Sequence, residues 1–81
     1  MSNQHIFELV VSNVREVVPE LENHDFSRTD SLRDLGANSI DRAEIIMLTL
    51  ESLSLRIPLV ELAGAKNLDE LVIAIHAKSH Q

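Results

Sequence analysis

The spacing of apolar residues is the feature that most constrains the fold, because it follows the period of an α-helix in separate segments of the chain. No segment long enough to form a sheet alternates apolar and polar residues with a period of two, so the pattern predicts an all-α protein. In the first helical segment, residues 3–18, the apolar positions are Ile6, Leu9, Val10, Val14 and Val17. Pro19 ends this helix, because proline cannot continue a helix and pushes Val18 towards an extended conformation.

A polar connection runs from Pro19 to Asn38. A loop of this length is uncommon in a compact domain unless it is functional or has its own anchors. The candidate anchors are Leu21, Phe26, Leu32 and Leu35. Beyond the loop we expect a helix over residues 39–53, a brief helix around 59–63 with Pro58 in its first turn, and a last helix that Asn67 caps. The inward stripe of the last helix is Leu68, Leu71, Val72 and Ile75.

These elements together predict the fold class and the domain organisation. A chain of 81 residues is one small domain. Three substantial helices, one short helix and a long first loop make a small four-helix bundle. Aromatic residues are only 2% of the chain, so the core must be aliphatic. We therefore expect one all-α domain over residues 1–81.

Composition argues against several classes of function. Thirteen acidic and seven basic residues give a net charge of −6, which repels phosphate backbones, so we expect no nucleic-acid partner. Cysteine is absent, which excludes disulfides and thiolate metal sites. The apolar runs are too short for a membrane span and the N-terminus lacks the pattern of a signal peptide, so we expect a cytoplasmic protein without a membrane partner. His76 and His80 have the spacing of metal ligands, but no third ligand is indicated, so we expect no metal site.

The helix over residues 39–53 has nearly two apolar stripes, although an ordinary surface helix needs only one. One stripe consists of Ile45, Ile46, Thr49 and Leu53. The neighbouring stripe consists of Ile40, Ala43, Met47 and Leu50, with Asp41, Glu44 and Glu51 beyond its edge. Either the helix is buried on most of its circumference, or one stripe packs in the bundle while the other faces a partner. The second interpretation is favoured, because few helices of a chain this short can be buried all round.

Ser39 stands at the start of this helix, where two roles are open to it. As the N-cap, its oxygen would accept an orphan backbone N–H, which is worth about 1 kcal/mol. Asn38 can cap equally well, with Asp41 complementing the helix dipole, and Ser39 is then free to point outward. A phosphate ester on its oxygen would lie at the positive end of the helix, beside free N–H donors. Spacing alone favours the plain cap and leaves the modified serine open.

The run Asp34-Leu35-Gly36-Ala37-Asn38-Ser39-Ile40-Asp41 resembles the attachment motif of acyl carrier proteins, whose usual form is D-L-G-x-D-S-L-D. The order of the helices, the long first loop and Ile57-Pro58 also resemble that family, over essentially the whole chain. The resemblance implies that Ser39 bears 4′-phosphopantetheine, which a phosphopantetheinyl transferase attaches covalently from coenzyme A. The thiol of this arm carries acyl groups as thioesters. Ser31, in the similar run Asp30-Ser31-Leu32, precedes the glycine turn, and we expect it to stay unmodified.

Departures from the usual motif indicate a subfamily. Asn38 replaces the usual Asp, while Arg42 and Leu50 occupy positions that tend to be neutral and acidic in fatty-acid carriers. The run 36–44, Gly-Ala-Asn-Ser-Ile-Asp-Arg-Ala-Glu, resembles discrete carriers of polyketide β-branching cassettes. This resemblance implies a donor of acetyl, formed from malonyl, to an enzyme of the hydroxymethylglutaryl-CoA (HMG-CoA) synthase type. An acyltransferase and a decarboxylating ketosynthase would be further partners.

The sequence thus predicts a monomeric carrier that serves enzymes without being one, since no nucleophile, base and cleft can be assembled from it. The predicted partner-binding residues are Ile40, Asp41, Arg42, Ala43, Glu44, Met47, Leu50 and Glu51. Three alternatives remain. The chain can be a fatty-acid or general polyketide carrier, or a peptidyl carrier, although Ala37-Asn38 does not fit the G-G-H-S motif of that family. It can also be a helical adaptor in which Ser39 is only a cap.

Overall fold

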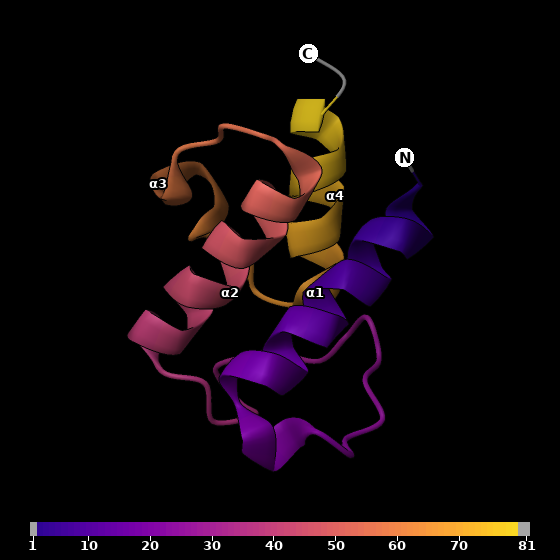
Figure 1. Ribbon diagram of the computed structural model, residues 1–81, viewed down its shortest axis with the longest axis vertical. Helices are drawn as coiled ribbons and strands as arrows, with labels where there is room; N and C mark the ends of the chain where they lie inside the picture. Colours follow the sequence, from indigo (N-terminus) through magenta and orange to yellow (C-terminus); the bar gives the residue numbers. More distant parts are fainter. Residues whose placement is uncertain (1, 80–81) are drawn as a thin grey trace.

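The computed structural model describes residues 2–79, which form four α-helices and one short 3₁₀ helix, η1, without any strand. The elements are α1 (Asn3–Val17), η1 (Pro19–Leu21), α2 (Ser39–Leu53), α3 (Leu59–Leu62) and α4 (Leu68–Ser79). α1 packs against both α2 and α4, and the short α3 contacts α2 and α4 on the side away from α1 (Figure 1). The predicted all-α four-helix bundle is therefore confirmed.

α1 begins and ends as its sequence predicts, to within one residue. The Ser2 hydroxyl accepts a hydrogen bond from the His5 N–H at 3.1 Å and caps the helix. Val18, just beyond the last helical residue, has φ −121°, because the proline that follows keeps it out of the helical region. The chain then turns through η1, which we did not predict. Pro19 opens η1, where its fixed φ suits a first helical position and its missing N–H costs nothing.

The long first loop, residues 22–38, lies at one end of the bundle and is joined to the start of α4 (Figure 1). Two loop carbonyls accept the N–H groups that begin α4: Asp30 O from Leu68 N and Arg28 O from Asp69 N, both at 2.9 Å. The first N–H groups of a helix have no partner within it, so the loop supplies the missing acceptors. The predicted anchors are confirmed, since Leu21 and Leu32 are buried while Phe26 and Leu35 pack against the core.

The core is aliphatic, as the composition requires. It contains Ile6, Val10 and Val14 of α1, Ile45 and Ile46 of α2, Leu62 of α3, and the whole predicted stripe of α4. One polar pair crosses it: the Asn13 amide donates to the Thr49 hydroxyl at 2.9 Å, and that hydroxyl donates to Ile45 O at 2.8 Å. Among the described residues no buried side-chain nitrogen or oxygen lacks a partner, so this pair does not leave a buried polar atom unsatisfied.

Candidate functional site

The turn before α2 places Ser39 at the surface. Gly36 adopts φ 101°, a conformation that L-residues rarely reach, and this reverses the chain after Leu35. Ala37 is then buried, with its N–H donating to Leu32 O at 3.0 Å, so the loop is fixed to the core just before the helix begins. Two residues later the chain emerges, and the side chain of Ser39 is exposed in the first position of α2.

Asn38, not Ser39, caps α2. Its side-chain oxygen accepts the Asp41 N–H at 2.8 Å, and its own N–H donates to the Asp41 carboxylate at 3.4 Å, which completes a capping box. The Arg42 N–H donates to Asn38 O at 2.9 Å. Within the described part of the chain, the N–H groups of Ser39 and Ile40 have no acceptor. The Ser39 hydroxyl is thus free, and it stands at the positive end of a fifteen-residue helix.

A cavity of about 490 Å³ opens beside Ser39, between the start of α2 and the segment that carries α3. Buried aliphatic residues line part of it: Leu32, Ile46, Leu62, Leu68 and Leu71. Its other lining residues come from the loop before α2, from the first half of α2, from Leu59 of α3, and from the link between α3 and α4. A cavity of this size accommodates a small organic group, and Ser39 is one of its lining residues.

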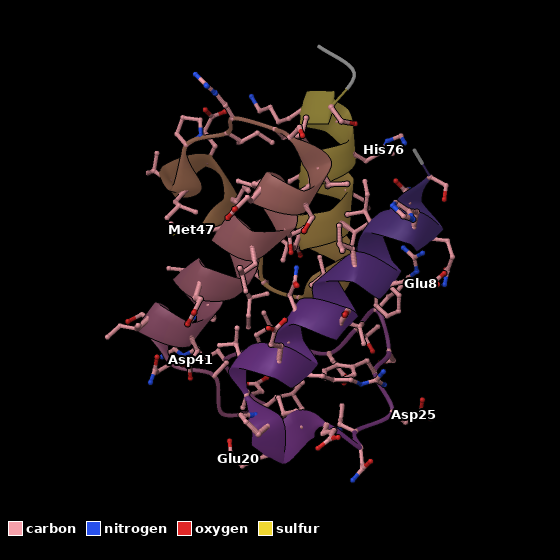
Figure 2. All side chains as sticks on the ribbon, in the orientation of Figure 1. Glu8, Glu20, Asp25, Asp41, Met47 and His76 are labelled. Carbon is pink, nitrogen blue, oxygen red and sulfur yellow. The ribbon has the colours of Figure 1, made fainter. Side chains whose placement is uncertain are left out.

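The predicted partner face is only partly on the surface. Ile40 is 76% exposed and Met47 is 56% exposed. Figure 2 shows Met47 midway along α2 and Asp41 at its first turn. Glu44 and Glu51 are exposed, and Asp41 and Ala43 are partly so. An exposed apolar pair with carboxylates around it is typical of a transient docking surface.

Two predicted partner residues are placed elsewhere by the structure. Leu50 is only 6% exposed and belongs to the core, so the prediction that it faces a partner is wrong. It lies one helical turn after the buried Ile46 and therefore on the inward arc of α2. Arg42 differs as well, because its guanidinium turns back to donate to Ala37 O at 2.7 Å and lines the cavity.

Sequence reasoning missed the exposed residues of α3. Val60 is 81% exposed and Leu59 lies at the edge of the cavity. A helix of four residues can bury only one side, and Leu62 occupies it, so the adjacent apolar residues Leu59 and Val60 had to remain outside. Gly64, which follows this helix, has no left-handed φ, and the last turn ends at Ala63 in right-handed conformation.

Ser31 and the two histidines near the C-terminus were predicted to have no functional role. Ser31, the second serine in a similar run, is partly buried, and its hydroxyl accepts the Asp34 N–H at 3.4 Å. In residues 2–79 no three His, Cys, Asp or Glu side chains gather as a metal site, and His80 lies outside the described residues. None of the described helices is long and apolar enough to span a membrane.

Comparison with known proteins identifies the class to which this fold belongs. The family described as "Phosphopantetheine attachment site" matches residues 8–75, which is most of the chain. The chain belongs to this family of carrier proteins, whose covalently attached group is 4′-phosphopantetheine.

Two relatives resemble the chain over nearly its full length. The polyketide biosynthesis acyl-carrier-protein AcpK of Bacillus subtilis (strain 168) is 51% identical over 78 residues, which are 96% of this chain and 95% of that protein. A chain in the crystal structure of the curacin biosynthetic pathway HMG synthase in complex with acetyl donor-ACP is 49% identical. It superimposes with a TM-score of 0.92, over 96% of this chain and 100% of that one. Both likenesses place the chain among acyl carrier proteins.

Proposed function

We propose that Ser39 carries the phosphopantetheine arm and that the chain is an acyl carrier, not an enzyme. The observation that carries this proposal is that the cap of α2 and the exposed hydroxyl at its start belong to two different residues. Asn38 caps the helix, so the Ser39 hydroxyl has no structural task and is exposed. Ser31, by contrast, bonds within its own turn.

The surroundings of Ser39 fit this group. The phosphodiester would lie at the positive end of α2, beside the free N–H groups of Ser39 and Ile40, where an anion is stabilised. The adjacent cavity offers space for part of the arm or its cargo. When bound, the arm supplies a thiol that forms thioesters, which explains how a chain without cysteine takes part in thiol chemistry.

Intact mass after incubation with coenzyme A and a broad-specificity phosphopantetheinyl transferase tests the assignment. We expect the wild-type protein and Ser31→Ala to gain the mass of one arm, and Ser39→Ala to gain none. Ser39→Ala should remain folded, because Asn38 and not Ser39 caps the helix. If Ser39→Ala still gains the arm, the site is wrong. If the wild-type protein gains nothing, the helical adaptor is the better interpretation.

We propose further that the chain is a donor of acetyl groups in polyketide biosynthesis, and that it serves an HMG-CoA synthase-type enzyme. Support comes from the curacin-pathway relative, which is an acetyl donor bound to an HMG synthase, and from AcpK, which is a polyketide carrier. The acetyl group would derive from malonyl. In that step the bond between the carboxylate and the α-carbon breaks, CO₂ leaves, and the α-carbon takes up a proton. A malonyl-loading acyltransferase and a decarboxylating ketosynthase would act before the transfer.

The donor role is tested by loading acetyl on this chain and on a fatty-acid carrier, then comparing the rates of transfer to the synthase. We expect a preference for this chain of about tenfold or more, equivalent to at least about 1.4 kcal/mol. Equal rates would leave a general polyketide or fatty-acid carrier as the function.

The docking surface in this proposal consists of Ile40, Asp41, Glu44, Met47 and Glu51, all of which belong to α2. Its exposed apolar side chains would contact the partner, and its carboxylates would steer a basic patch towards it. Met47→Ala and Glu44→Lys should each slow transfer several-fold while the melting temperature stays within about 4 °C of wild type, since surface changes rarely exceed about 0.5 kcal/mol. Ser12→Ala, an exposed change on α1, is the matched control and should transfer at the wild-type rate. Unchanged transfer in both docking variants would rule out this surface.

The cytoplasmic location and the monomeric state remain predictions.

A further inference from the structure

The side chains that line the cavity beside Ser39 have a net positive charge, whereas the protein as a whole is negative. Three of the seven basic residues line it, namely Arg33, Arg42 and Lys66, and none of the thirteen acidic residues does. They come from three separate elements: the loop before α2, the first turn of α2, and the link between α3 and α4. A chain with a net charge of −6 thus surrounds this one cavity with cations.

These cations differ from other basic residues of the chain, which form ion pairs. Arg28 and Lys78 are paired with Asp69 and Glu61, at 3.4 and 2.6 Å. Among the described residues, Arg33, Arg42 and Lys66 have no carboxylate partner. Arg42 uses a guanidinium nitrogen to donate to Ala37 O at 2.7 Å, and a guanidinium has five N–H donors, so others remain available.

The Glu70 carboxylate contacts the cavity wall through the backbone of Lys66 and not through its ammonium group. Glu70 accepts the backbone N–H of Lys66 at 3.2 Å and is not among the residues that line the cavity. The Lys66 ammonium is therefore not neutralised there, and its side chain is exposed at the rim together with that of Arg33. Below this cationic rim lie buried aliphatic residues, among them Ile46 and Leu62.

We propose that this cavity is a subsite for the free carboxylate of the acyl cargo, so that the carrier holds malonyl but not acetyl. The inference rests on the proposed attachment of the arm to Ser39 and names the cargo that the cavity recognises. A guanidinium binds a carboxylate through two parallel hydrogen bonds, and a flanking ammonium adds charge without strict geometry. The aliphatic floor suits the single methylene group between the carboxylate and the thioester.

Such a subsite distinguishes the two states of the cargo. Before decarboxylation the carboxylate is held by the cations, which keeps malonyl against the carrier. Afterwards the acetyl group has no charge for Arg33, Arg42 or Lys66 to bind, and it is free to enter the active site of the accepting enzyme. The phosphodiester beside Ser39 is the other anion that these cations can attract, and it is present in every loaded state.

The experiment compares backbone and side-chain NMR spectra of isotope-labelled protein in four states: without the arm, with the unloaded arm, with acetyl and with malonyl. Intact mass is recorded first, so that a failure to attach the arm is recognised as failure of the Ser39 assignment. We expect chemical-shift differences between the malonyl and acetyl states at Arg33, Arg42 and Lys66 and in the segment 62–68. These differences should be lost in Arg33→Gln/Lys66→Gln, whose two side chains are exposed.

Arg56→Gln is the matched control, because Arg56 is an exposed arginine outside the cavity and lines a separate depression near Lys78. This variant should keep the malonyl-specific differences. Identical cavity shifts for acetyl and malonyl overturn the proposal. It is equally overturned if the full shifts arise when the unloaded arm is attached and do not change with the cargo, because the anion is then the phosphodiester.

Discussion

The first loop and the segment around α3 both connect main helices, yet they are held in place in different ways. The first loop has no α-helix, but its carbonyls cap α4. Arg28 of this loop forms an ion pair with Asp69 of α4, and its guanidinium lies 5.0 Å from the centre of the Phe7 ring of α1. The α3 segment contains a helix, but that helix buries one residue, Leu62, and is joined to α4 by the ion pair of Glu61 with Lys78.

The comparison shows that a segment without an α-helix can be joined to the main helices by more contacts than a segment that contains one. The polar loop acts as part of the scaffold because it satisfies backbone groups that α4 cannot satisfy alone. The α3 segment forms one side of the cavity beside Ser39, and α2 forms the opposite side. The segment beside the proposed cargo site is therefore joined to the main helices by fewer hydrogen bonds and ion pairs than the first loop is.

The largest effect is expected from removing the anchor of α3. Leu62→Ala should lower the free energy of unfolding by about 2–5 kcal/mol, because Leu62 is buried in the core and a cavity would remain. Urea denaturation measures the loss, with Leu32→Ala in the first loop as the matched change. A loss below about 1 kcal/mol for Leu62→Ala alone would mean that α3 is not part of the cooperative unit.

A glycine from each region gives the next comparison. Gly36→Ala should destabilise by about 1–2 kcal/mol, since φ 101° strains any L-residue although no atom lies within 4 Å of the new Cβ. Gly64→Ala, in the α3 segment, has open space and no left-handed φ, so it should stabilise by about 0.4–1 kcal/mol. Thermal unfolding measures both changes. Equal effects of the two substitutions would contradict the assigned turn geometry.

The cross-links of the two regions should differ more modestly. Arg28→Met should cost about 1 kcal/mol, because it removes a partly exposed ion pair and a cation–π contact with Phe7. Lys78→Met removes only the ion pair with Glu61 and should cost about half as much. Chemical denaturation at low and at high salt distinguishes them. A greater loss for Lys78→Met would reverse the order of anchoring that we assign to the two regions.

The smallest effect is a pH dependence confined to the first loop. The backbone N–H of Ser27 donates to Asp30, and this bond, followed by that of His24, holds the pKa of Asp30 below its ordinary value of 3.8. Ionised Asp30 therefore stabilises the fold above pH 3.8, and this stability is lost as the pH falls through the depressed pKa.

Asp30→Asn should accordingly be less stable than wild type at neutral pH, and the gap should close in acid. Unfolding followed by circular dichroism from pH 7 to pH 2 measures it. Asp34→Asn is the control, because the Asp34 carboxylate has no hydrogen-bond partner among the described residues, and its profile should follow that of wild type. A gap between wild type and Asp30→Asn that persists unchanged in acid would argue against this account of the loop.

Much of the fold could be predicted from local chemistry. Both ends of α2, Ser39 and Leu53, match the prediction, because a capping residue and the apolar pattern mark them within a few positions. The sequence left open whether Ser39 or Asn38 caps α2, and the structure shows that Asn38 does. η1 was missed because its signal is short, and Pro19 was interpreted only as the end of α1.

The sequence by itself determined the helical class and the residue at which α2 begins, because periodicity, proline and capping act within one turn of the chain. That Asn38 and not Ser39 caps α2, which leaves Ser39 exposed, was decided by the structure. Only the tertiary structure decided that Leu50 is buried and that Arg42 turns onto Ala37 O. It alone brought Arg33 and Lys66 to the same cavity. The physical reason is that burial and charge at these positions depend on neighbours from distant segments, and no local pattern records which segments will meet.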